Sequence, residues 1–91
     1  MLRTLLVLLV TASPAFAIQC GDRAAIVGEL ARKYDEYPRT MALTSGKTLL
    51  ETYISKSGTW TMLETKPAGL TCIIAAGEDW EMIGPPVKVT G

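Results

Sequence analysis

The chain has 91 residues, with nine basic residues, nine acidic residues and no histidine, which gives a formal net charge of zero. This balance argues against binding to nucleic acid, which requires a concentrated basic surface, and against a polybasic membrane-surface role. Without histidine, Ser-His-Asp and Cys-His catalytic arrangements are excluded. We predict no metal site and no cofactor, since both cysteines are expected to be bonded to each other.

Residues 1–17 contain the three parts of a secretory signal peptide in order. Arg3 supplies a positive start, residues 5–10 form an apolar run, and Ala15 and Ala17 are small residues before a cleavage site. The apolar run is shorter than the roughly 20 residues that span a bilayer. The pattern predicts cleavage after Ala17 and a periplasmic or secreted protein. Lipid attachment at Cys20 is a second possibility, which the bulky polar Gln19 disfavours.

Cleavage would leave 74 residues (91 less 17) with two cysteines, Cys20 and Cys72. In an oxidising compartment, a disulfide between them is the expected pairing. Closing a loop of this length stabilises a folded chain by about 4 kcal/mol in the chain-entropy model. The reactive alternative has no support, because the chain lacks both a C-x-x-C motif and a neighbouring histidine.

The first predicted element of the remaining chain is an amphipathic helix over Asp22–Tyr37. Asp22 offers an N-cap, and Pro38 is expected to end the helix. The apolar stripe recurs at three- and four-residue spacing, through Ala24, Val27, Leu30, Ala31 and Tyr34.

After Pro38 the pattern changes from helical to extended. Short loops containing glycine separate segments rich in β-formers, at Thr40–Thr44, Lys47–Ser55, Thr59–Thr65 and Leu70–Ala76. Short loops favour antiparallel neighbours. The prediction is an α+β fold, with one N-terminal helix packed on a three- to four-stranded antiparallel meander and one disulfide. The domain is predicted to cover residues 18–83, followed by a C-terminal tail at 84–91.

The predicted disulfide also suggests which face of the sheet the helix covers. A bond from Cys20, just before the helix, to Cys72 in the last strand ties the two elements together. The residues that share the face of Cys72 are then expected to point at the helix, namely Leu70, Ile74 and Ala76.

Two motifs resemble functional sites. Residues Ser45–Thr48 read like the end of a phosphate-binding loop, but Met41 stands where that motif needs glycine, and a strand pattern follows instead of a helix. A hairpin turn is expected there. Residues 78–81 hold the acidic cluster Glu78, Asp79 and Glu81, whose spacing matches no known calcium loop and favours a solvated turn.

The aromatic residues are the remaining candidates for a functional surface. If Cys72 and Leu50 define the covered side of the sheet, Trp60 and Tyr53 lie on the opposite side as a possible partner-binding surface, with Trp80 nearby. The alternative, which we favour, is that Trp60 packs against Trp80 as a second, smaller core.

The order of these features resembles a family of small uncharacterised exported proteins of alphaproteobacteria and their phages. The resemblance is carried by the signal peptide, the cysteine that opens a helix, and the sequence pattern formed by Ser57–Thr61, Pro67, Gly69, Thr71-Cys72, Ala76-Gly77 and Trp80. It implies a periplasmic or secreted location and a helix followed by strands. It implies no activity and no catalytic residues.

Three functions are consistent with these observations. The first is a non-enzymatic periplasmic module that binds an unknown protein or envelope partner through an exposed sheet face. The second is an inhibitor of a peptidase or cell-wall hydrolase, and the third is a minimal enzyme that uses the carboxylates of Glu64, Glu78, Asp79 and Glu81.

Overall fold

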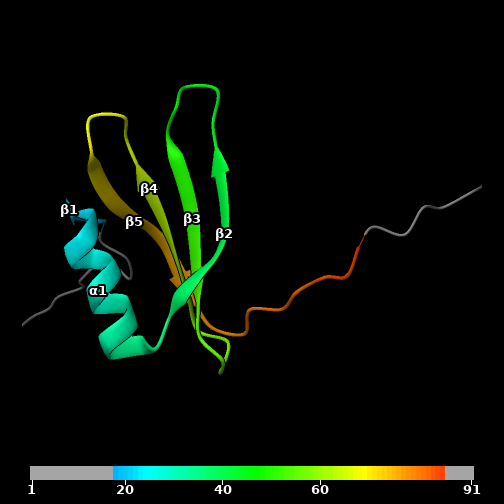
Figure 1. Ribbon diagram of the computed structural model, residues 1–91. Coiled ribbons are helices and arrows are strands. Elements are labelled where there is room, and N and C mark those ends of the chain that lie inside the picture. The colour runs from blue at the N-terminus through cyan, green and yellow to red at the C-terminus, as the bar shows by residue number, and fades with distance from the viewer. Residues whose placement is uncertain (1–17, 86–91) are drawn as a thin grey trace, which may run out of the picture.

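The structure, a computed structural model, describes residues 18–85. The predicted signal peptide, its cleavage site and most of the predicted tail therefore lie outside the described residues. The elements follow in the order β1 (Gln19–Asp22), α1 (Arg23–Tyr34), β2 (Tyr37–Leu43), β3 (Leu49–Ile54), β4 (Trp60–Thr65) and β5 (Leu70–Gly77) (Figure 1).

The strands form one five-stranded antiparallel sheet in the spatial order β1-β5-β4-β3-β2. The predicted fold is wrong in two respects. The helix follows a first strand and is not the N-terminal element, and the sheet has five strands where three or four were predicted. Strand β1 escapes prediction because it has four residues, two of which, Gly21 and Asp22, are weak strand formers. Its pairing with β5 makes it a strand.

The predicted disulfide is present and joins β1 directly to β5. Cys20 is the register partner of Cys72, with their Cα atoms 3.9 Å apart. The strand order makes β1 the edge strand on one side of the sheet and β2 the edge strand on the other. The bond secures only the β1 edge.

Helix α1 begins as predicted and ends earlier. Asp22 is the N-cap, and its carboxylate accepts a hydrogen bond from the amide of Ala25 at 3.1 Å. The helix stops at Tyr34 because Asp35 adopts a left-handed conformation, with φ at 55°. The amides of Asp35 and Glu36 then donate to the last carbonyls of the helix at 3.2 and 3.1 Å. Pro38 therefore lies within β2 and does not end the helix.

The predicted hairpin at Ser45–Thr48 is confirmed. The amide of Thr44 donates to the carbonyl of Thr48 at 2.9 Å, and Lys47 has the positive φ typical of a three-residue hairpin loop. The other two tight turns have Gly58 and Gly69 at φ of 99° and 106°, where a side chain would be strained.

A small core lies between α1 and one face of the sheet. It consists of Leu30, Tyr53 and Leu63, with Ile73 among the residues packed against it. Because side chains alternate along a strand, Cys72 must point to the opposite face from Ile73. The prediction that the Cys72 face carries the helix is therefore wrong, and the disulfide lies on the face away from α1.

A register shift in β5 explains why Ala76, which alternation alone would place on the face of Cys72, lies on the face that α1 covers. Leu63 pairs with Ile73, whereas the preceding residue Met62 pairs with Ala75, so Ile74 is an extra residue. This bulge turns Ala76 to the α1 side, opposite Thr61. Of the three residues predicted to share the face of Cys72 and point at the helix, Ala76 reaches it only through the bulge.

Figure 1 shows that α1 lies beside the sheet towards its β1 end, and that the β2–β3 hairpin extends beyond the helix. Within residues 18–85, no helix combines the length and apolar character needed to cross a membrane.

Candidate binding surfaces

The predicted exposed pair of Trp60 and Tyr53 does not exist. Tyr53 is only 1% exposed and packs under α1 with Leu30 and Leu63. The alternation of residues along β3 was predicted correctly, but α1 covers the face that carries Tyr53 and not the face that carries Leu50. Two assumptions produced this error, namely that Cys72 marks the covered side and that Trp60 and Tyr53 share a face. Tyr53 pairs with Thr61, so Trp60 lies on the opposite face of the sheet, which also carries Cys72.

Tyr53 takes part in a polar cluster with Arg23 and Glu51. Arg23 donates from Nε to Glu51 Oε1 at 3.0 Å and from Nη2 to Oε2 at 2.5 Å, which is a two-pronged ion pair. Arg23 Nη2 also donates to the Tyr53 hydroxyl at 3.2 Å. The hydrogen bond that Arg23 donates to Glu51 raises the pKa of Arg23, and burial raises the pKa of Tyr53. These groups satisfy one another, so the cluster fixes α1 on the sheet.

Trp60 packs against Trp80, as the favoured alternative predicted. Their ring centroids are 5.7 Å apart in an edge-on arrangement. The amide of Trp80 donates to the carbonyl of Gly58 at 2.9 Å, which holds the segment after β5 beside the β3–β4 turn. Both rings are half-buried. This pair therefore closes one end of the sheet and leaves only part of each ring for a partner.

The acidic residues of the predicted turn do not assemble into a metal site. Glu78, Asp79 and Glu81 are exposed, and residues 18–85 contain no group of three or more side chains placed to hold a metal ion. Among residues 18–85, the hydrogen bonds and ion pairs of the carboxylates go to other kinds of group, and no two carboxylates are hydrogen-bonded to each other.

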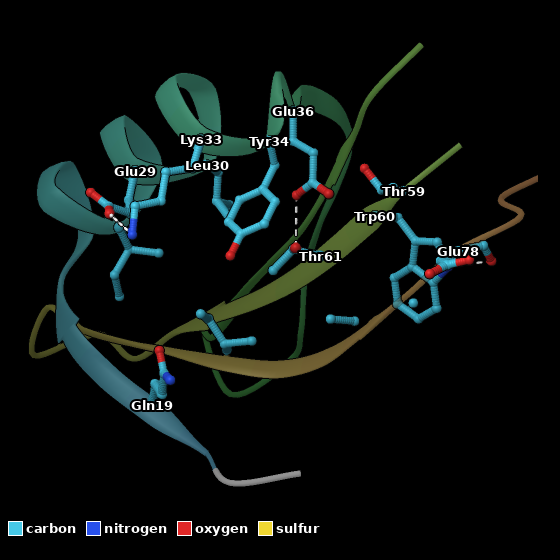
Figure 2. Close-up of a pocket in the computed structure, with 14 residues that line it drawn as sticks. Gln19, Glu29, Leu30, Lys33, Tyr34, Glu36, Thr59, Trp60, Thr61 and Glu78 are labelled. Atoms are coloured by element: carbon cyan, nitrogen blue, oxygen red, sulfur yellow. Dashed lines mark hydrogen bonds and ion pairs between the residues drawn. The ribbon is translucent and has the colours of Figure 1, made fainter. Parts of the chain in front are cut away.

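An open groove of about 750 Å³ lies between α1 and the sheet (Figure 2). This volume is within the range of small-molecule sites. Apolar side chains from the helix and β5 line it together with several polar groups, including Ile26, Leu30, Tyr34, Ile73, Ala76, Glu29, Lys33, Glu36 and Thr61. Arg23 holds α1 to the sheet near the start of the helix, and the turn at Asp35 returns the chain to the sheet at its end.

Glu36 is the unusual residue of this groove. Its side chain returns beneath the last turn of α1 because the left-handed Asp35 reverses the chain. It is 2% exposed, and the Thr61 hydroxyl donates to its Oε1 atom at 2.7 Å. Among residues 18–85, no basic side chain forms an ion pair with it. The nearby Glu29, in contrast, is paired with Lys33 at 3.0 Å, and this hydrogen bond lowers the pKa of Glu29.

The second notable surface is the free edge formed by β2. All seven of its residues are exposed, and three are large and apolar: Tyr37, Met41 and Leu43, at 52%, 72% and 61% exposure. Neighbouring strand β3 is mostly buried by comparison. An exposed, apolar edge strand is an established place for another strand to pair.

The register shows which backbone groups of β2 are free. Thr44 and Thr48 are a hydrogen-bonded pair, and such pairs alternate with non-hydrogen-bonded pairs along an antiparallel ladder. The backbone N–H and C=O groups of Ala42 therefore point towards β3. Those of Met41 and Leu43 point away from the sheet and are free to pair with another strand.

Neither the groove nor the β2 edge was predicted from the sequence. The sequence around β2 does have one feature that could have indicated a binding surface: residues 37–48 contain Arg39 and Lys47 but no acidic residue. Glu36 carried no signal, since an acidic residue before a proline-containing strand reads as a solvated turn.

Comparison with protein-family models, with curated proteins and with solved structures finds no match to this chain.

Proposed function

We propose that this protein is an exported, non-enzymatic binding module that takes up an extended segment of a partner protein as an additional strand along β2. The observation that carries the proposal is that all seven residues of β2 are exposed, including its three large apolar side chains. Added strands gain affinity from backbone hydrogen bonds and specificity from alternate side chains. The disulfide and the predicted signal peptide are consistent with a location outside the cytoplasm.

The protected part of the edge limits where the partner strand lies. Pro38 has no N–H to donate, and a register shift follows it at Arg39. Such features discourage pairing. The stretch from Thr40 to Leu43 has no charge and no proline, and it carries the outward-pointing groups of Met41 and Leu43. The partner strand therefore aligns with this half of β2.

Charge favours a partner of different sequence over a second copy of this chain. If two copies of β2 paired antiparallel about a two-fold axis at Ala42, Arg39 of one copy and Lys47 of the other would lie at the same end of the paired strands. No acidic residue lies within 37–48 to balance them. The complementary segment is apolar in its centre and acidic at its ends.

The experiment is a selection of peptides from a random display library on the immobilised, disulfide-bonded protein. We expect enrichment of peptides with alternating apolar residues and acidic ends. The L43P variant removes one outward N–H and adds a ring at a position where edge strands tolerate proline, so it should fold but lose about tenfold or more in affinity for the selected peptides.

The matched control is L43T, which keeps the N–H and the strand preference while removing the leucine side chain. It should retain more binding than L43P. Selected peptides that bind L43P as tightly as the unaltered protein would contradict the proposal, as would a selection that enriches no sequence pattern at all.

Export has its own test, which is the mass of the protein recovered from the expressing cell envelope. The proposal expects a chain that begins at Ile18 and lacks two hydrogens because of the disulfide. A lipid adduct on Cys20, or free thiols on both cysteines, would contradict it.

A further inference from the structure

We infer that the groove between α1 and the sheet is a binding site for a primary amine with an apolar body, whose ammonium group pairs with Glu36. This inference is independent of the proposed strand pairing on β2, because none of the residues that line the groove belongs to β2.

The first step is the state of the Glu36 carboxylate. It is 2% exposed, and among residues 18–85 its side chain has one hydrogen-bond partner, the Thr61 hydroxyl on Oε1. A buried carboxylate that has lost water needs more than one neutral donor to offset the cost of desolvation. Figure 2 shows the carboxylate facing the groove below the end of α1. The remaining oxygen, Oε2, is therefore the atom at which a cationic group of a ligand would gain the most binding free energy.

The second step is the kind of cation. A metal ion requires several protein ligands, and residues 18–85 contain no group of three candidate side chains. A guanidinium group pairs best with both oxygens of a carboxylate at once, and Glu36, which is only 2% exposed, gives such a planar fork less room than it gives a compact cation. An ammonium group is compact and can bond a single oxygen. The geometry therefore favours an ammonium over a guanidinium or a metal.

The third step is the remainder of the ligand. Ile26, Leu30 and Ile73 are apolar side chains that line the same groove as Glu36. The ring of Tyr34 lies beside Glu36 on the helix side of the groove (Figure 2). An aliphatic or aromatic group attached to the ammonium would lie against these side chains. The amines that fit best are therefore short alkylamines and arylalkylamines.

The test compares 2-phenylethylamine with 2-phenylethanol, which has the same body and no charge, by calorimetric titration of the disulfide-bonded protein. We expect the amine to bind at least about tenfold more tightly than the alcohol, as a charge-assisted hydrogen bond implies. In the E36Q variant, which keeps the size and the acceptor for Thr61, this preference should disappear. The E64Q variant changes a carboxylate outside the groove and should behave like the unaltered protein.

A thermal unfolding measurement on the unaltered protein keeps the test valid even if E36Q does not fold. The amine should raise the unfolding temperature more than the alcohol at equal concentration. Equal effects of the two compounds, retention of the amine preference in E36Q, or no binding of either compound at millimolar concentration would overturn the inference.

Discussion

At the scale of single residues, charged side chains in this protein divide by their surroundings. Glu51 is buried, and Arg23 meets both of its oxygens while also bonding Tyr53. Glu29 pairs with Arg32 and Lys33 at an exposed position on the helix. Glu36 is as buried as Glu51 but has no such cation among residues 18–85. Burial without a cation is what separates the candidate ligand residue from the structural ones.

The difference between the buried and exposed ion pairs can be measured by denaturation. R23M should lower the free energy of unfolding by about 2 kcal/mol, because Glu51 is left buried without its charge-assisted hydrogen bonds. R32M removes an exposed pair and should change it by less than about 0.5 kcal/mol.

The double variant R23M/E51M supplies a further check of this explanation. Replacing both partners should cost less than R23M alone, since no unpaired charge remains in the interior. A double variant less stable than R23M would show that the pair itself, and not the unpaired buried carboxylate left behind, determines the loss.

At the scale of elements, periodicity predicts most of the chain. Helix α1 and strands β3, β4 and β5 lie close to their predicted positions because each has a regular apolar pattern and a loop on either side. β1 could not be predicted, since Gln19–Asp22 has no such pattern and depends on pairing with β5. The covered face also could not be predicted, because alternation gives two faces without stating which one α1 covers.

The bulge at Ile74 illustrates why the groove was missed. It turns Ala76 towards α1 and brings Gly77 opposite Trp60, and it leaves no trace in a run of β-forming residues. The position of Glu36 is equally hidden, because it depends on the backbone reversal at Asp35. Both features arise from pairing and capping between segments, which local sequence does not contain.

Two glycine substitutions of the same kind should have opposite effects on stability. G28A adds a methyl group with no atom within 4 Å in the interior of α1, so it should raise the free energy of unfolding by about 0.5–1 kcal/mol. G77A places the methyl group 3.0–3.1 Å from the Trp60 ring and should lower it by about 1–2 kcal/mol.

Tryptophan fluorescence provides the associated readout. G77A should change the emission of the Trp60–Trp80 pair, whereas G28A should leave it unchanged. If G77A proves neutral and spectroscopically silent, the close packing of Trp60 on β5 is incorrect.

At the scale of the whole molecule, a small core is combined with a covalent bond. The fully or nearly buried apolar residues between α1 and the sheet are Leu30, Tyr53 and Leu63. A core of this size gives limited stability, and small domains often add a crosslink. The Cys20–Cys72 bond joins residues that are 52 positions apart in the sequence and fixes β1 at the sheet edge.

Reduction of the disulfide should therefore weaken the fold substantially. We expect the free energy of unfolding to fall by about 4 kcal/mol in reductant, as the loop length implies in the chain-entropy model. A C20A/C72A variant should be equally weakened and insensitive to reductant. An unchanged denaturation midpoint, with both thiols shown to be free, would mean that the bond contributes little to stability.

The two edge strands differ in length, with four residues in β1 and seven in β2. The central claim is that the longer edge, β2, binds a partner strand. Amide hydrogen exchange tests this claim most directly. In the free protein, the amide of Ala42 should be protected, and those of Met41 and Leu43 should exchange rapidly. A selected peptide should slow exchange at Met41 and Leu43. Unchanged exchange at these two amides in the presence of bound peptide would contradict the claim.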